Sequence, residues 1–182
     1  MCKFVVTASL LLLCASASLA QSADYPKFDF SAGYTVNFSD LRGNITLGRE
    51  TFNGFTLAPA ANINKTFGIE GDVTYTTKKL STAVPSVTGP RVNLFSYMGG
   101  PRFTARPADK KLQPFAHALF GGAHASVLTI SENGFAAKFG GGLDIVARKH
   151  ISVRVFQLDY YLTRFAGQNS NNVALTFGVR LF

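Results

Sequence analysis

Strict alternation of apolar and polar residues is the feature that most constrains the fold of this chain. Between Phe28 and Phe38 every even position is apolar, and every odd position is small or polar. The pattern recurs over Phe67 to Thr77, Phe135 to Ala147 and Val173 to Leu181. A period of two residues places alternate side chains on opposite faces of a β-strand, whereas a helix needs a period of about 3.6. The sequence therefore predicts β-strands.

Four less regular segments complete a predicted set of eight strands: Phe52 to Ala61, Val92 to Phe103, Leu112 to Ala123 and Ile151 to Leu162. Pro59 lies in the first of them, and proline is tolerated best at a bulge or a strand end. In the last of them, Arg154 and Asp159 fall on opposite faces of a regular strand. A β-bulge between them would return both to one face, at a position that the sequence does not give.

The predicted connections alternate in length. The longer ones are Ser39 to Thr51, Lys78 to Arg91, His124 to Asn133 and Thr163 to Asn171; the shorter ones are Asn62 to Thr66, Thr104 to Lys111 and Arg148 to His150. Long outer loops, short periplasmic turns and an even strand number are typical of outer-membrane barrels, in which both termini face the periplasm.

The first twenty residues read as a secretory signal peptide. Lys3 precedes the apolar run Phe4 to Leu13, and Ser18-Leu19-Ala20 fits a cleavage site. The apolar run is too short to cross a membrane as a helix. Cys14 raises the alternative of a lipoprotein, which Leu13 disfavours because a small residue should precede a lipidated cysteine. We therefore expect a signal peptide at 1–20 and one barrel domain at 21–182, without disulfides because no cysteine follows Cys14.

Alternation alone does not say which face of the barrel is apolar. A soluble lipocalin-like barrel buries its apolar face, and a membrane barrel turns that face to lipid. The polar face here carries mostly Gly, Ser, Thr and Asn rather than the Lys and Glu of a solvent surface. We therefore predict an all-β, eight-stranded antiparallel up-and-down transmembrane β-barrel in a bacterial outer membrane.

Aromatic residues agree with that orientation, since they form two belts at the predicted membrane interfaces. The predicted periplasmic belt is Phe28, Phe67, Phe103, Phe115 and Phe182, and the predicted outer belt is Phe38, Phe52, Tyr75, Phe95, Phe135 and Phe165.

Charged residues on the polar face are expected inside the barrel. They are Asp29, Glu70, Asp72, Arg102, Lys138, Asp144 and Arg154, with Arg180 as a further candidate. Isolated buried charges are costly, so these groups should pair with one another. We interpret them as a salt-bridged plug that fixes the strand register; a gate or proton path is the alternative.

The chain is basic, and part of that charge falls in the predicted outer loops at Arg42, Arg49, Lys78, Lys79, Arg91 and Arg164. An exported protein rarely meets nucleic acid, so the expected anionic partner is outer-membrane lipid, in particular the phosphates of lipopolysaccharide. A merely solvated rim is an equally good interpretation.

Motifs for catalysis are weak. His124-Ala125-Ser126, with Glu132 nearby, has the residue types of a hydrolase triad, but a three-residue match is unspecific. No spacing of histidines, cysteines or carboxylates predicts a metal site, and nothing predicts a cofactor. We expect no enzymatic activity.

Three stretches carry a family resemblance: Met98 to Phe103, Pro114 to Ala123 and Leu158 to Phe165. Together they resemble a group of outer-membrane β-barrel proteins common in Acidobacteria and similar to the OmpA transmembrane domain. The resemblance implies the eight-stranded barrel and the outer-membrane location, but no activity, and we expect no OmpA-like peptidoglycan-binding domain. Phe182 is similar to the C-terminal signal that the outer-membrane assembly machinery reads, although it lies one residue out of the alternation that ends at Leu181.

These observations predict a monomeric outer-membrane barrel with a structural or surface-interaction role. The alternatives are a narrow channel for small solutes and, with less support, a hydrolase that modifies lipid A.

Overall fold

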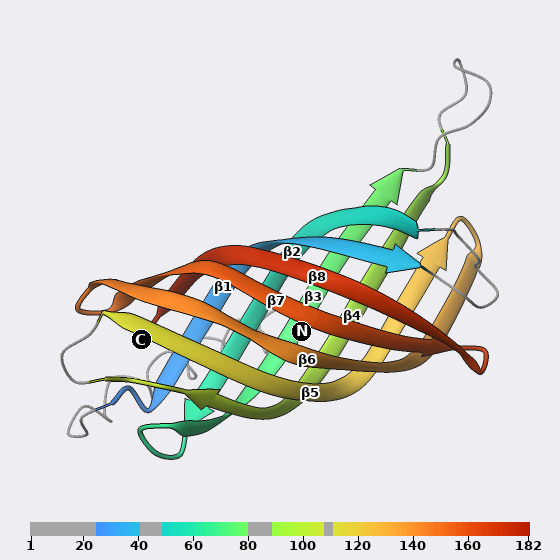
Figure 1. Ribbon diagram of the computed structural model, residues 1–182. Coiled ribbons are helices and arrows are strands. Elements are labelled where there is room, and N and C mark those ends of the chain that lie inside the picture. Colours follow the sequence, from blue (N-terminus) through green and yellow to red (C-terminus); the bar gives the residue numbers. More distant parts are fainter. Residues whose placement is uncertain (1–24, 41–48, 80–88, 108–110) are drawn as a thin grey trace, which may run out of the picture.

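The computed structural model describes residues 25–40, 49–79, 89–107 and 111–182, and these form eight antiparallel strands that close into one barrel (Figure 1). Each strand pairs with the next in sequence, and β8 pairs with β1. The strands are β1 (Phe28–Asp40), β2 (Arg49–Asn62), β3 (Phe67–Lys79), β4 (Arg91–Thr104), β5 (Leu112–Val127), β6 (Ile130–Arg148), β7 (Ile151–Phe165) and β8 (Gln168–Leu181). The structure confirms the predicted fold class. Within the described residues, no helix is long and apolar enough to span a membrane.

Both ends of the barrel sequence lie at the same end of the molecule. Phe30 at the start of β1 pairs with Leu181 at the end of β8, which closes the sheet there. We call this the termini end; it also carries the turns 63–66 and 149–150 and the connection from β4 to β5. The opposite end, which carries the hairpins β1–β2, β3–β4, β5–β6 and β7–β8, is called the hairpin end (Figure 1).

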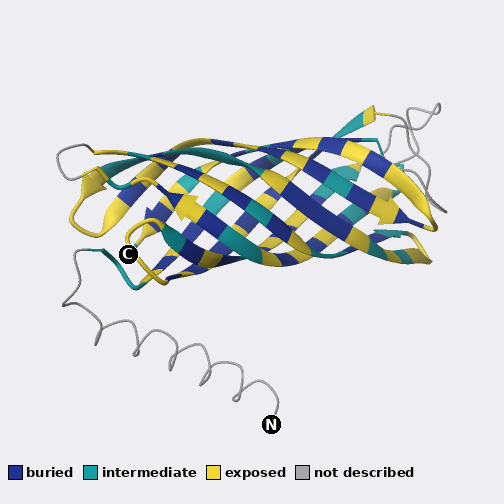
Figure 2. Cartoon of the chain, turned by 60° about the horizontal axis from the view of Figure 1, so that its bottom comes forward, coloured by how far each residue is buried: buried dark blue, intermediate teal, exposed yellow. Residues whose placement is uncertain are grey.

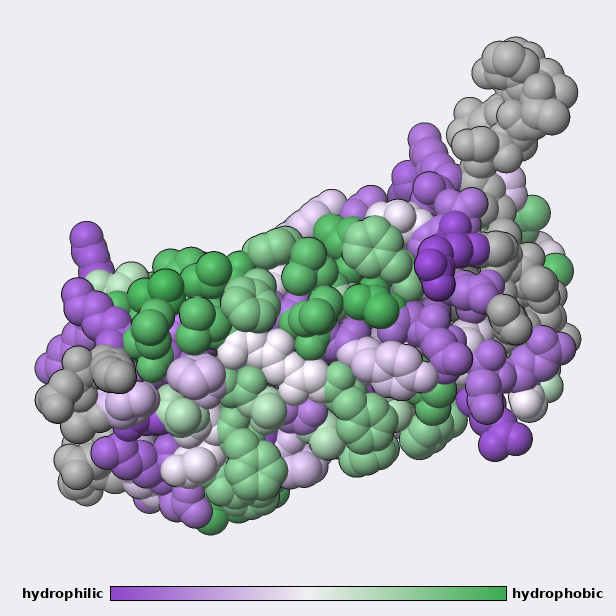
Figure 3. Space-filling model, viewed as in Figure 1, coloured by the Kyte–Doolittle hydropathy of each residue, from purple (hydrophilic) through white to green (hydrophobic). Residues whose placement is uncertain are grey.

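The two faces of the sheet have the reverse polarity of a water-soluble protein. Large apolar side chains point outward, with Phe55 65% and Tyr97 57% exposed, while Asp72 and Arg102 are each 1% exposed. Buried and exposed residues alternate along the strands (Figure 2), and an apolar band separates two hydrophilic ends (Figure 3). An outward apolar band with a polar interior is the arrangement of a membrane barrel. A soluble lipocalin-like barrel is thereby excluded.

The expected β-bulge lies in β7. The register of β7 against both neighbours shifts after Arg154, and Val155 and Phe156 both point outward. Because of this extra residue, Arg154 and Asp159 are both buried inside the barrel. Pro59, by contrast, lies at neither a bulge nor a strand end. It points outward within β2, where pairing with β3 stops at Leu57 and resumes in unchanged register at Ala60, so its missing N–H costs no regular hydrogen bond.

Two predicted long connections are wrong. The residues 124–133 and 163–171 are mostly strand, and the connections are only Leu128-Thr129 and Ala166-Gly167. Cross-strand pairing continues to Val127↔Ile130 and to Phe165↔Gln168. The sequence pattern predicted strands that are too short. Polar residues such as Asn133 and Asn171 continue the cross-strand pairing beyond the apolar band, where hydropathy no longer alternates.

The predicted aromatic belts need three corrections. Phe52, Phe115 and Phe165 face the barrel interior and are 0%, 6% and 2% exposed. Their strands alternate in the opposite phase: in β2, for example, Phe55 and Leu57 are the outward residues. The outward members of the two belts at strand positions include Phe28, Phe38, Tyr75, Phe95, Phe103 and Phe135.

Candidate functional site

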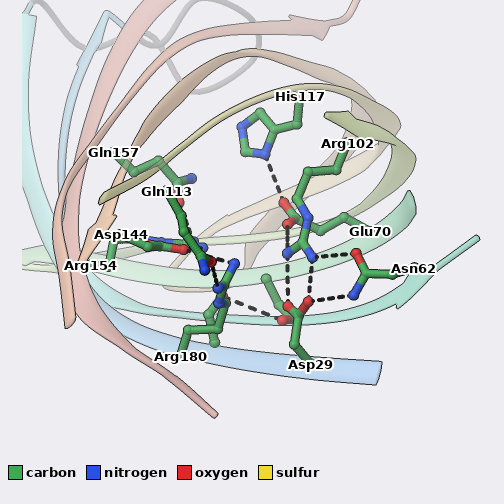
Figure 4. Close-up of polar contacts among 12 residues, drawn as sticks. Asp29, Asn62, Glu70, Arg102, Gln113, His117, Asp144, Arg154, Gln157 and Arg180 are labelled. Carbon is green, nitrogen blue, oxygen red and sulfur yellow. Dashed lines mark hydrogen bonds and ion pairs between the residues drawn. The ribbon is translucent and has the colours of Figure 1, made fainter. Parts of the chain in front are cut away.

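The interior of the termini half of the barrel is filled by one connected polar network, drawn in Figure 4. It forms because each strand places its inward positions at alternate residues, and charged or amide side chains occupy those positions on all strands there. Every strand except β2 contributes at least one ionisable group, and β2 contributes Asn62.

Arg102 on β4 is the centre of the first part of this network. Its Nη1 and Nη2 donate to the two carboxylate oxygens of Asp29 on β1, at 2.9 and 2.5 Å. Nη1 also donates to Glu70 on β3, at 3.0 Å. The Asn62 amide donates to Asp29 at 2.8 Å and accepts from Arg102 at 3.2 Å. One guanidinium thus holds two carboxylates from different strands in the fork geometry that suits arginine.

His117 on β5 continues the network between two carboxylates. Its Nδ1 lies 2.7 Å from Glu70 Oε1, and its Nε2 lies 2.9 Å from Asp159 Oδ1 on β7. Both ring nitrogens donate only when the imidazole carries both protons, so this geometry suits a charged histidine. Gly140 on β6 makes room for the pair, because a Cβ there would collide with the Asp159 carboxylate.

Asp144 on β6 organises the third part of the network. It accepts from Arg154 Nε at 2.9 Å and lies 3.3 Å from Arg180 Nη1. Arg154 also donates to Gln157 at 2.6 Å, and Gln157 donates to Asp159 at 2.7 Å, which joins this part to His117. Arg180 in turn donates to Gln113. The network therefore runs without interruption from Asn62 to Gln113 across the barrel.

Arg106, just beyond β4, is the member of the network that lies nearest the termini end. It donates to Asn62 at 2.9 Å and to the Lys65 carbonyl at 2.5 Å. Burial and the nearby Arg180 lower the pKa of Arg106 to about 10. It still carries its charge at neutral pH, because that pKa lies well above 7.

A second, smaller cluster lies closer to the middle of the barrel. Lys138 on β6 donates to Asp72 at 2.8 Å and to Thr74 at 2.9 Å, and its ammonium lies 5.5 Å from the centre of the Tyr161 ring. From Thr74, hydroxyl contacts of 2.7 to 2.8 Å continue through Thr56 and Thr35 to Thr176. This ladder ties β3, β2, β1 and β8 together inside the barrel.

The ionisable groups buried on the strands are equal in number, and Arg106 beyond β4 adds one further cation, 3.8 Å from Asp29. Among the described residues, the buried carboxylates on strands are Asp29, Glu70, Asp72, Asp144 and Asp159, and the buried bases are Arg102, Lys138, Arg154, Arg180 and His117. Five acids meet five bases when His117 is protonated. Buried charges are tolerated when they are paired and hydrogen-bonded in this way.

The interior of the hairpin half is filled differently. An apolar cluster there contains Phe52, Val92, Leu94, Met98, Leu119, Ala123, Ala125, Ala136, Tyr161 and Phe165. Phe52, Val92 and Leu119 are each 0% exposed. Small polar groups fill the remaining wall; Ser39, for example, donates to Asn172 at 2.9 Å. The barrel is thus closed by charges in one half and by apolar packing in the other.

The structure places all seven predicted interior charges, and Arg180, inside the barrel. It also adds groups that sequence reasoning did not assign to the interior, chiefly His117, Asn62, Gln113, Gln157 and Arg106. His117 could have been found, because Phe115, His117 and Leu119 occupy the same inward face of β5. Arg106 lies beyond a strand, where alternation gives no information.

The predicted outer-loop bases lie at the hairpin end where they are described. Arg49, Lys79, Arg91 and Arg164 are exposed, Lys78 pairs with Glu50 at 3.2 Å, and Arg42 lies outside the described residues. Lys79 and Arg91 stand directly opposite one another on β3 and β4. Phe182 lies just after β8, where its N–H donates to the His150 carbonyl and the Arg180 guanidinium lies 5.1 Å from its ring.

The residues of the possible hydrolase triad do not assemble into one. His124 Nδ1 contacts Asn133 Oδ1 at 2.8 Å. Glu132 pairs across the strands with the buried Ala125, so it lies on the other face of the hairpin from His124 and Ser126. In the described part of the chain, no group of three or more His, Cys, Asp or Glu is placed to hold a metal ion.

Comparison with known families supplies the decisive finding. Residues 7–181 match the model of the outer membrane protein beta-barrel domain. The chain belongs to this family. It is therefore a β-barrel protein of the bacterial outer membrane, and its termini end is the periplasmic end because an even strand number places both termini there.

Solved structures share the fold at low sequence identity. Ail, the attachment invasion locus protein of Yersinia pestis, is 18% identical with a TM-score of 0.54, and the match covers 85% of this chain and 97% of Ail. Neisserial surface protein A is 16% identical with a TM-score of 0.62, covering 85% and 96%. OprG from Pseudomonas aeruginosa is 9% identical with a TM-score of 0.52, covering 85% and 94%. No curated protein matches the sequence.

Proposed function

We propose that this protein is a closed, non-catalytic outer-membrane barrel whose hairpin end contacts lipopolysaccharide or external partners. The observation that carries the proposal is the filled interior. Charged groups spanning the termini half are paired across seven strands, and bulky apolar groups fill the hairpin half. Side chains that fill an eight-stranded barrel leave its outer wall and its ends as the surfaces for function.

The hairpin end has a feature that suits an anionic partner. Lys79 and Arg91 are directly opposite each other, and like charges in that position destabilise a strand pair. The loop residues 41–48 and 80–90 contain no Asp or Glu, so the sequence supplies no carboxylate there. A phosphate between the two side chains would relieve the repulsion. One neighbour, Ail of Yersinia pestis (18% identical, TM-score 0.51), was solved in complex with the heparin analogue sucrose octasulfate, which supports a search for anionic partners.

Binding of purified lipopolysaccharide to the folded protein in detergent tests this proposal. A Lys79→Gln/Arg91→Gln variant should bind roughly three- to tenfold more weakly at low ionic strength, and the difference should shrink at high salt. The matched control is Lys79→Arg/Arg91→Lys, which keeps both positive charges at the same positions and should leave the affinity nearly unchanged. Equal loss in both variants, or no loss in either, would contradict the proposal.

A narrow channel for small solutes is the second candidate, favoured by the continuous polar network through the termini half. Planar-bilayer recording of the purified protein separates the two functions. The closed barrel should give no discrete openings at any voltage tested, and reproducible single-channel steps would replace our proposal with the channel.

A hydrolase would require Ser126, so a change in the lipid A profile on overexpression that disappears in Ser126→Ala would show catalysis.

A further inference from the structure

Exposed charge at the termini end is basic and comes from three separate turns. Lys65 lies in the β2–β3 turn, Lys111 precedes β5, and Arg148 and Lys149 form the end of β6 and its turn. All four residues are exposed, and none forms an ion pair with another described residue. In the sequence, the segments 63–66, 105–111 and 148–150 contain six Lys or Arg and one acid, Asp109.

Other cations at this end have structural partners, which sets the four apart. Arg106 donates to Asn62 and to the Lys65 carbonyl, so it holds the turns together. Lys27 donates to the Tyr25 hydroxyl at 3.1 Å and packs over the same ring. The side chains of Lys65, Lys111, Arg148 and Lys149 make no comparable contact with the described residues, so holding the fold does not account for these side chains.

Each of the four lies next to the edge of the apolar outer wall at the termini end. Lys65 is two residues from Ile63, Lys111 adjoins Leu112, Arg148 pairs with Ile151 across β6 and β7, and Lys149 is two residues from Ile151. Ile63, Leu112 and Ile151 are 57%, 46% and 38% exposed. At about 3.3 Å per residue along a strand, a separation of one or two residues places the backbone of each basic residue within about 7 Å of the backbone of a lipid-facing residue. Their long aliphatic stems can follow the wall while the charge reaches the headgroup layer.

We propose that Lys65, Lys111, Arg148 and Lys149 form a basic ring that binds anionic phospholipid headgroups of the periplasmic leaflet. Cations placed at headgroup level attract anionic lipids, and the attraction fades within a Debye length of the surface. The turns 63–66 and 149–150 are short, so their side chains stay at this level. A cell-wall polymer or a soluble acidic partner would need to approach the membrane surface itself to meet them.

Spin-labelled lipids can measure this preference. The protein is folded into preformed phosphatidylcholine vesicles, and spin-labelled phosphatidylglycerol or phosphatidylcholine is then added from outside. Because no cysteine follows Cys14, single Asn64→Cys and Leu128→Cys variants with a water-soluble maleimide report which end faces the added lipid. When the termini end faces outward, phosphatidylglycerol should associate with the protein roughly three- to tenfold more strongly than phosphatidylcholine at low salt. The preference should fall several-fold at about 0.5 M salt.

Two sets of variants make the test specific. Lys65→Gln/Lys111→Gln/Arg148→Gln/Lys149→Gln should reduce the preference to about one, whereas Lys65→Arg/Lys111→Arg/Lys149→Arg should retain it. Both sets change exposed residues only, and heat-modifiable gel mobility verifies that each has folded. Equal association of the two lipids with the parent, or an unchanged preference in the glutamine variant, would overturn the inference. Sedimentation with peptidoglycan that depends on the four bases, without a lipid preference, would also overturn it. None of these three outcomes bears on lipopolysaccharide binding at the hairpin end, which is tested separately through Lys79 and Arg91.

Discussion

Arg102 holds Asp29 and Glu70 inside the barrel, so its loss would leave two buried carboxylates without their main partner. Replacing it by methionine, which has a similar length and no charge, should lower the free energy of unfolding by about 3–5 kcal/mol. Urea titration of the protein folded in vesicles, followed by gel mobility, measures this change.

A compensated variant separates lost charge pairing from lost packing. Arg102→Met/Asp29→Asn should recover most of the stability, because it removes one acid together with one base and leaves Glu70 paired with His117. If the free energy of unfolding of Arg102→Met alone differs from that of the parent by less than about 1 kcal/mol, the ion pairs contribute little to the stability of this fold.

At the residue scale, the sequence predicted most of the charges that lie inside, though not His117 or Arg106, and it did not predict which contacts they make. Alternation gives the face of a strand position, so Asp29, Glu70 and Lys138 could be assigned to the interior. It does not give the stagger between strands, and that stagger brings His117 to Asp159 across the barrel. The error with Phe52 and Phe115 has another origin: an aromatic residue fits either face of the sheet, so it does not by itself give the phase in which its strand alternates.

The β7 bulge offers a prediction at the scale of one element. Arg154 and Gln157 are three residues apart and both face inward, because Val155 and Phe156 both point outward. Deleting Val155 leaves a regular alternation with Arg154, Gln157 and Asp159 still inside, so the variant should fold. Deleting Tyr160, in the regular part of the strand, moves the residues on one side of it to the opposite face. That variant should fail to give the heat-modifiable band, and equal folding of both deletions would contradict the assignment.

The β7–β8 hairpin allows a stabilising change. Ala166 and Gly167 have φ angles of 44° and 78°, and two positive φ angles in a two-residue loop favour Asn-Gly. Ala166→Asn should raise the free energy of unfolding by about 0.5 kcal/mol, measured by urea titration. Gly167→Ala is the matched control: a Cβ there meets nothing within 4 Å, so its expected loss of about 1 kcal/mol reports the backbone alone. An unstable Ala166→Asn variant would show that the turn differs from this geometry.

Element boundaries were harder to predict than element number. Eight strands could be counted from the sequence, and the need for a bulge followed from Arg154 and Asp159. The hairpins at Leu128-Thr129 and Ala166-Gly167 were missed because neither contains the usual Asn-Gly or Asp-Gly pair. Moreover, the strands extend past the apolar band, where side chains such as His124 and Asn133 carry no alternation of hydropathy.

For the whole molecule, the two kinds of interior packing lie one after the other along the barrel axis. The charged network occupies the termini half, and the apolar cluster with Phe52, Leu94 and Leu119 extends to the hairpin half. An ion crossing the barrel would have to pass both. Opening one half alone should therefore not produce a pore, because the other half still excludes a continuous column of water.

Planar-bilayer recording of three variants tests this series arrangement. Glu70→Ser/Arg102→Ser/His117→Ser removes linked members of the network, and Phe52→Ser/Leu94→Ser/Leu119→Ser truncates the apolar cluster. Each set alone should show no discrete openings, whereas the combined variant should conduct, provided that gel mobility shows a folded barrel. The protein is refolded at the lowest urea concentration that prevents aggregation, so that urea adds little to the stability already lost in the combined set. Conduction by the network variant alone would mean that the apolar half does not close the barrel, and the charged network would then be its only barrier to ions.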